Sequence, residues 1–217
     1  MISISHGRFV PTARAMLLAT LLAAGAITSA CATMYVDNGL PEVPPERMPK
    51  VAQASPVQLL FEFRTKGTLN TRATDFLKDD VAEITRKSGL FSSVSNEPIS
   101  GAGVLSLVID NVPITGQSDA AAKGFVTGLT FGLAGSAVSD GYTCTADYVL
   151  PAGNTRLKKE VRHAIHTTVG AKGAPANSTK AKNMEAAART MTSQIVSNAL
   201  SQLAEDPAFA AAGASPP

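Results

Sequence analysis

Cysteine and histidine are the side chains of this sequence with the widest chemical repertoire. The two cysteines are Cys31 and Cys144, and two of the three histidines, His163 and His166, are three residues apart. On a helix that spacing would place both imidazoles on one face, whereas in a strand it places them on opposite faces. The polar and apolar residues around them alternate, which favours a strand. We therefore expect a packed His163, a solvent-exposed His166 and no shared metal, since zinc needs three or four convergent ligands.

The remaining reactive side chains do not form a recognisable catalytic pattern. Cys144 lies in a predicted strand, where a buried, inert thiol is the common outcome. Asp79, Asp80 and Glu83 fall on the polar face of a predicted helix, and a solvated face explains them better than a cation site. The sequence has no serine nucleophile elbow, no HExxH motif and no phosphate-binding loop. We predict that the protein is not an enzyme and uses no cofactor or metal; a hydrolase whose site is assembled from distant residues is the weaker alternative.

The first 31 residues have the pattern of a secretory signal peptide. Residues 1–14 carry Arg8 and Arg14 and no acidic residue, residues 15–26 are apolar, and small residues precede Cys31. A basic start, a short apolar core and small residues before the cleavage site are typical of such peptides. The apolar run is too short to span a bilayer, which takes about 20 residues. We predict a signal peptide over residues 1–30.

The residues around the predicted cleavage site narrow this interpretation. Thr28-Ser29-Ala30-Cys31 resembles the lipobox of bacterial lipoproteins, although Thr28 stands where that family usually has leucine. The resemblance implies a diacylglyceryl thioether on Cys31, cleavage between Ala30 and Cys31, and acylation of the new amino group. An ordinary signal peptide is the alternative. In that family an aspartate after the cysteine retains the protein in the inner membrane, so Ala32 implies the outer membrane, with the domain facing the periplasm.

The charge balance excludes one class of partner. Removing residues 1–30 takes Arg8 and Arg14 from the 19 basic residues, which leaves 17 basic against 17 acidic residues and a formal net charge of zero. Nucleic-acid binding needs a basic field, so we expect no nucleic-acid partner. The length of the mature chain suits one domain with flexible ends.

We expect the mature chain to have three parts. Residues 31–56 are rich in proline, which removes backbone donors and fixes φ. This composition predicts an extended, lipidated tether. Residues 57–205 predict a single α+β domain, and residues 206–217 a disordered tail of small residues and prolines.

The domain shows both strand and helix periodicities. Alternating apolar residues predict strands over residues 57–64, 104–109 (continuing weakly to 114), 141–150 and 157–169, the last two forming an antiparallel hairpin. A 3.6-residue period predicts helices over residues 70–88 and 179–203. Asn70 or Thr71 can cap the first helix, and Gly89 ends it. The fold class is therefore α+β, with an antiparallel or mixed sheet of about four strands packed against two helices.

The segment 124–138 is glycine-rich, apolar and uncharged. Gly124, Gly128 and Gly132 are spaced by four, as in membrane helix packing motifs, whereas a period of two would place Phe125 and Phe131 on one face. Periodicity does not decide between these, and glycine disfavours both helix and strand. Three hypotheses remain open: a buried segment covering the sheet, an interfacial segment that enters lipid, and a membrane-inserting hairpin of an oligomeric pore. Under the last two, these glycines and phenylalanines would contact the membrane or another subunit.

The order of elements, together with the lipobox, resembles that of small periplasm-facing lipoproteins of Gram-negative bacteria, some of which are auxiliary parts of export or envelope-assembly machines. We therefore predict a non-enzymatic binding or assembly lipoprotein of the cell envelope. The lipid on Cys31 would attach the protein to the membrane, and we expect its protein partner to be another envelope protein. The oligomeric state is left open. The alternative is an oligomeric transport or secretion component that uses residues 124–138 to oligomerise or insert.

Overall fold

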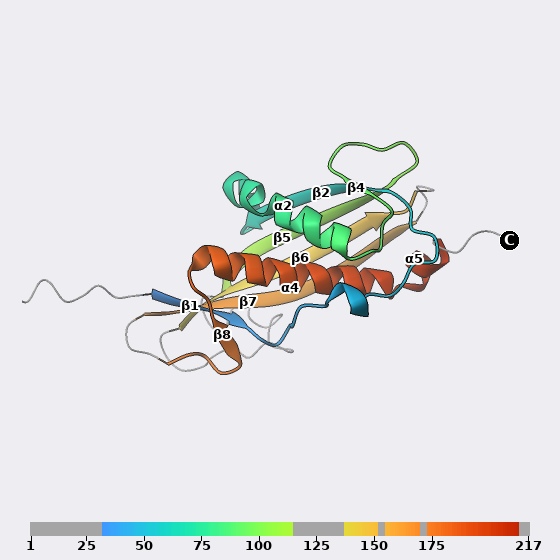
Figure 1. Ribbon diagram of the computed structural model, residues 1–217. Coiled ribbons are helices and arrows are strands. Elements are labelled where there is room, and N and C mark those ends of the chain that lie inside the picture. Colours follow the sequence, from blue (N-terminus) through green and yellow to red (C-terminus); the bar gives the residue numbers. More distant parts are fainter. Residues whose placement is uncertain (1–31, 115–136, 152–154, 170–172, 213–217) are drawn as a thin grey trace, which may run out of the picture. The chain divides into compact units, whose positions relative to one another are not determined.

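The computed structural model describes residues 32–114, 137–151, 155–169 and 173–212 (Figure 1). Within them the chain forms a mixed sheet of eight strands: β1 (Ala32–Asp37), β2 (Val57–Thr65), β3 (Thr68–Leu69), β4 (Val94–Ser95), β5 (Gly103–Ile114), β6 (Ala137–Val149), β7 (Arg156–Val169) and β8 (Ser178–Lys180). The order across the sheet is β3-β2-β5-β6-β7-β1-β8, and β4 pairs with β2.

Strands β5, β6 and β7 are the centre of the sheet and pair antiparallel in sequence order. Strand β2 lies parallel to β5, and β1 lies antiparallel to both β7 and β8. Alternate residues of the central strands are buried, such as Leu105, Leu107 and Ile109 in β5. That period of two identifies the face of the sheet that carries the core.

Helices α2 (Thr71–Lys87) and α4 (Met184–Ala204) cover that face (Figure 1). Each begins at an asparagine whose side chain accepts a hydrogen bond from the third residue of the helix: Asn70 from the Ala73 amide at 3.1 Å and Asn183 from the Ala186 amide at 2.8 Å. Such caps satisfy backbone donors that the helix leaves without partners. Gly89, at φ 69°, follows α2 in the left-handed conformation. A short helix, α5 (Pro207–Ala212), and a 3-10 turn, η1 (Pro45–Arg47), complete the described elements.

The predicted sheet of about four strands against two helices is wrong. The four predicted strands are present as β2, β5, β6 and β7, but the described residues add β1, β3, β4 and β8, and a third helix, α5. The helix predicted from residue 179 begins at Met184 instead, because residues 178–180 pair with β1. The added strands have two to six residues. They form because neighbouring strands offer backbone partners, and their own sequence shows little periodicity.

Residues 32–56 also differ from the expected tether. Strand β1 is paired on both sides, and Tyr35, Val36 and Met48 are buried. The segment after β1 is fixed to α4: the Val43 amide donates to Ser197 Oγ at 3.0 Å, and Asn198 Nδ2 donates to the Pro41 carbonyl at 2.8 Å. Proline prevents regular pairing here, but it does not prevent packing.

The start of the expected disordered tail is helical instead. Asp206-Pro207 does end α4, and α5 follows it directly. Phe209 of α5 is buried against Phe91 and Tyr148, with ring centroids 5.9 and 5.5 Å apart. Phe209 thus packs α5 onto the domain.

Candidate functional site

The residues that the sequence singles out for lipidation and membrane contact lie outside the described part of the chain. They are Ala30, Cys31, Gly124, Phe125, Gly128, Phe131 and Gly132. The described residues that adjoin them share one end of the sheet. In the strand register, Ala32 lies opposite Val169, Thr168 opposite Ala137, and Ser139 opposite Ile114. Ala32 follows Cys31, and Ile114 and Ala137 flank the undescribed segment, so the predicted anchor and the predicted insert both join the domain at this end.

A buried polar cluster links the strands near this end. His166 of β7 contacts Ser139 of β6 through Nδ1, at 2.8 Å from Ser139 Oγ, and Asp37 of β1 through Nε2, at 3.2 Å from Asp37 Oδ2. All three side chains are buried, with His166 and Asp37 fully inaccessible to solvent. The prediction of a solvent-exposed His166 is therefore wrong. His166 does lie on the opposite face of β7 from His163, as a strand requires, but that face is also covered here.

The cluster has the residue types of a serine hydrolase triad. With the proton on Nε2, the imidazole donates to the Asp37 carboxylate and its Nδ1 accepts from the Ser139 hydroxyl. A nucleophile must, however, reach a substrate and lie beside donors that stabilise the oxyanion. Ser139 is buried between two strands, with its hydroxyl hydrogen already engaged. The arrangement instead satisfies a buried carboxylate and ties β1 to β6 and β7.

His163 lies in the core under α4. Its Nε2 is 2.6 Å from Gln194 Oε1, and the side chain is fully buried. Burial lowers the pKa of His163, partly opposed by the hydrogen bond to Gln194. The imidazole is thus a neutral packing group, as the sequence predicts, and not a solvent-facing ligand.

Cys144 is a fully buried free thiol in β6. Burial raises its pKa to about 12. Because the thiolate is the nucleophile and the metal ligand, the predicted inert thiol is confirmed. Among the described residues, no group of three or more histidine, cysteine, aspartate or glutamate side chains is placed to hold a metal ion.

The acidic face of α2 is engaged in ion pairs. Glu83 pairs with Arg86 and Lys87 on its own helix, and Asp80 pairs with Arg189 of α4. The Arg189 guanidinium also lies over the Phe76 ring, 4.5 Å from its centroid. The two contacts of Arg189 connect α4 to α2.

A groove lies between the first halves of α2 and α4 and above the sheet. It encloses about 360 Å³. Its lining is mainly apolar, with polar groups from the ends of β2 and β5 and the starts of the helices: Phe63, Thr65, Asn70, Arg72, Ala73, Phe76, Leu77, Asn111, Tyr142, Met184, Glu185, Ala188 and Met191. Burial and the neighbouring Asp140 raise the pKa of Tyr142, so its phenol stays protonated. Sequence reasoning predicts both helices but misses the groove, because their separation depends on tertiary packing.

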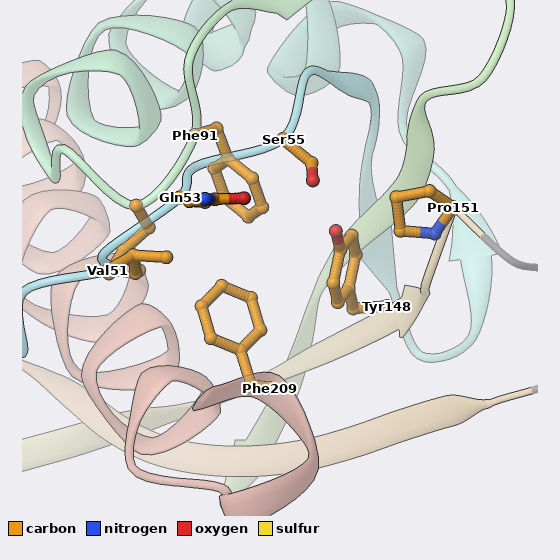
Figure 2. A pocket seen from close by; sticks show the side chains of 8 residues that line it. Val51, Gln53, Ser55, Phe91, Tyr148, Pro151 and Phe209 are labelled. Carbon is orange, nitrogen blue, oxygen red and sulfur yellow. The ribbon is translucent and has the colours of Figure 1, made fainter. Parts of the chain in front are cut away.

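A second pocket, at the other end of the domain, is much smaller. Figure 2 shows Phe91, Tyr148 and Phe209 gathered with Val51, Gln53, Ser55 and Pro151 around it. Its volume of about 20 Å³ suits roughly one water molecule. This pocket is a packing gap among aromatic rings and not a ligand site.

None of the helices formed by the described residues combines the length and apolarity that a membrane span requires.

No protein-family model matches the chain, and no curated protein matches it significantly. Similar solved structures include rare lipoprotein B from Shewanella oneidensis (TM-score 0.37, 15% identity, 69% of this chain and 94% of that chain). Another is the PelC dodecamer from Paraburkholderia phytofirmans (TM-score 0.34, 13% identity, 80% of this chain and 97% of that chain). A third is a minor lipoprotein from Acinetobacter baumannii (TM-score 0.30, 15% identity, 68% of this chain and 88% of that chain). The fold thus has a distant likeness to proteins described as lipoproteins. At these TM-scores the likeness assigns no role to this chain.

Proposed function

We propose that this chain is a lipid-anchored, non-enzymatic binding protein of the bacterial cell envelope, held at the outer membrane by acyl chains on Cys31. The N-terminal pattern supports the anchor. The single observation that carries the binding role is the groove between α2 and α4, whose volume of about 360 Å³ falls within the range of roughly 300–1,000 Å³ usual for binding pockets.

The lining of the groove suits apolar side chains of a protein segment. Met191 is a flexible, polarizable side chain that adapts to varied surfaces, and Phe63, Phe76 and Tyr142 supply rigid aromatic walls. The charged groups, Arg72 and Glu185, are exposed near the starts of the two helices. An amphipathic segment of another envelope protein would place its apolar face against the lining and its polar face toward these charges.

A groove-filling substitution tests this role. Ala188 lines the groove and is partly buried, so Ala188→Trp should fill part of the space without disturbing the core beneath it. Gln202→Trp, on an exposed position near the end of the same helix, is the matched control. Wild-type protein and both variants would be purified from detergent-solubilised envelopes under identical conditions.

We expect a protein that co-purifies with wild type and with Gln202→Trp but is lost from Ala188→Trp, while the thermal unfolding midpoints of both variants stay close to that of wild type. A partner retained by a folded Ala188→Trp variant would contradict binding in the groove. Co-purification that is the same for all three proteins would mean that the partner binds elsewhere.

A further inference from the structure

Exposed apolar side chains gather at one corner of the described domain. Five large hydrophobic residues are notably exposed among the described residues, and three of them, Val138 (57%), Val169 (48%) and Met184 (48%), belong to this corner. Val138 pairs with Thr167 in β7, next to the pairing of Ala32 with Val169. Met184 begins α4, three residues after Ala181, whose amide donates to the Met34 carbonyl at 2.8 Å. The other two, Leu60 and Leu69, lie at the opposite edge of the sheet in β2 and β3.

The same corner adjoins the predicted lipid anchor. Strand β1 begins at Ala32, so a single peptide link separates Cys31 from a residue paired with Val169. One residue of chain spans at most about 3.6 Å. The acyl chains on Cys31 must therefore enter the bilayer beside this corner. In Figure 1 the start of β1, strand β8 and the start of α4 lie together at this end.

Basic side chains stand beside these apolar residues. Lys180 of β8 pairs with Tyr35 of β1, and Lys182 lies between β8 and α4; both are exposed. Glu185, next to Met184, is the exposed acid nearest to them in sequence. Lysines close to a bilayer surface interact favourably with anionic headgroups, by about 1 kcal/mol each.

We propose that this corner, formed by Val138, Val169, Met184, Lys180 and Lys182, is a membrane-facing rim that rests on the bilayer, with the apolar side chains at the level of the headgroups and the lysines against anionic lipid. The proposal rests on the lipidation of Cys31 in the proposed function. Contact of the rim with lipid fixes the orientation of the domain relative to the membrane, which an anchor on a long tether would leave free. The strands rise from the membrane, and the 14 residues of β7 carry the opposite end roughly 45 Å away.

Depth-dependent quenching tests the orientation. Val138→Cys, Val169→Cys and Met184→Cys each place a single reactive thiol on the rim, because Cys144 is buried with a raised pKa and the sulfur of Cys31 is blocked when it carries lipid. Gln202→Cys is the matched control, exposed on the same helix as Met184 and about 27 Å further along it. Full-length lipidated proteins labelled with an environment-sensitive nitrobenzoxadiazole dye would be reconstituted into vesicles of neutral and anionic phospholipids. Nitroxide-labelled lipids are the quencher.

The rim probes should be quenched several-fold more strongly than the Gln202→Cys probe. Lys180→Glu with Lys182→Glu should reduce that difference in anionic vesicles and not in neutral ones. Equal quenching at rim and control positions, in protein that floats with the vesicles, would overturn the membrane-facing rim and leave the anchor intact. Protein that does not float would overturn the anchor, and the rim with it.

Discussion

Buried polar side chains hold β1, the first described strand, on the sheet. Asp37 is the last residue of β1, and its Oδ1 accepts from the Gly39 amide at 2.6 Å while its Oδ2 contacts His166. Burying a carboxylate is costly unless its hydrogen bonds are satisfied. The cluster of Asp37, His166 and Ser139 meets that requirement only when β1 is docked in register on β7. It thereby stabilises the strand that lies next to the predicted anchor.

Removing the imidazole should destabilise the fold strongly. His166→Ala deletes the shared partner of Asp37 and Ser139 and leaves a cavity beside a buried carboxylate. We expect the free energy of unfolding to fall by about 3 kcal/mol, measured by urea denaturation of the unlipidated domain. Glu160→Ala, which removes an exposed ion pair with Arg162 on the same strand, should change it little. Equal effects of the two substitutions would mean that the cluster does not stabilise β1.

The lowered pKa of His163 should make the free energy of unfolding depend on pH. Burial lowers its pKa in the folded state, so the unfolded chain takes up a proton more readily than the folded one. Its contribution to stability is complete above the unfolded histidine pKa of about 6.5 and is lost as pH falls below that value. His163→Gln should therefore lose less stability than wild type between neutral pH and about pH 5.5. Parallel stability curves for the two proteins would contradict a neutral, buried His163.

At the scale of elements, local signals and tertiary packing make separate contributions. The caps at Asn70 and Gly89, and the alternation along β2, β5, β6 and β7, are local, so the sequence predicts these elements close to their observed bounds. Strands β1 and β8 depend on pairing with distant residues. Their short length and the prolines that follow β1 hide them from any analysis of periodicity.

Gly89 offers a direct test of the local signals. Its φ of 69° is strained for residues with a β-carbon, and no atom lies within 4 Å of where that carbon would stand. Backbone strain alone should therefore set the cost. We expect Gly89→Val to lower the free energy of unfolding by about 1–2 kcal/mol, and Gly89→Asn to lower it less, because asparagine tolerates the left-handed region. A urea midpoint unchanged by Gly89→Val would show that α2 does not end in this conformation.

In the candidate site, too, the features set by neighbouring residues are predicted and those set by tertiary packing are not. The sequence predicts the burial of His163 and Cys144, because each depends on neighbours within a few residues, and the structure confirms both. The anchor on Cys31 stays a prediction. The sequence misplaces His166 and misses the groove. The covering of His166 requires Asp37, 129 residues away in the chain, and the groove requires two helices that are separated by the whole sheet meander.

At the scale of the whole molecule, the main consequence is the closeness of the folded domain to the lipid anchor proposed on Cys31. The expected tether would allow the domain to sample many orientations. Strand β1 instead begins at Ala32, the residue after Cys31, and pairs with residues 165–169 at the end of β7. Recognition by the groove would then take place close to the membrane surface.

The residue after the anchor should control which membrane holds the protein. In lipoproteins of the resembling family an aspartate at this position retains the protein in the inner membrane. Ala32 is exposed in β1, so Ala32→Asp should leave the fold intact and move the protein from outer-membrane to inner-membrane fractions on a density gradient. Ala32→Ser serves as the control and should remain in the outer membrane. An Ala32→Asp protein that stays with the outer membrane would contradict the sorting proposed here.

Labelling of growing cells with a radioactive fatty acid tests whether Cys31 carries the lipid. The thioether forms on the Cys31 sulfur before cleavage, so wild-type protein should be labelled and processed, whereas Cys31→Ser should remain unlabelled and uncut. Equal label in the two proteins, or processing of Cys31→Ser to the wild-type length, would contradict the lipidation of Cys31.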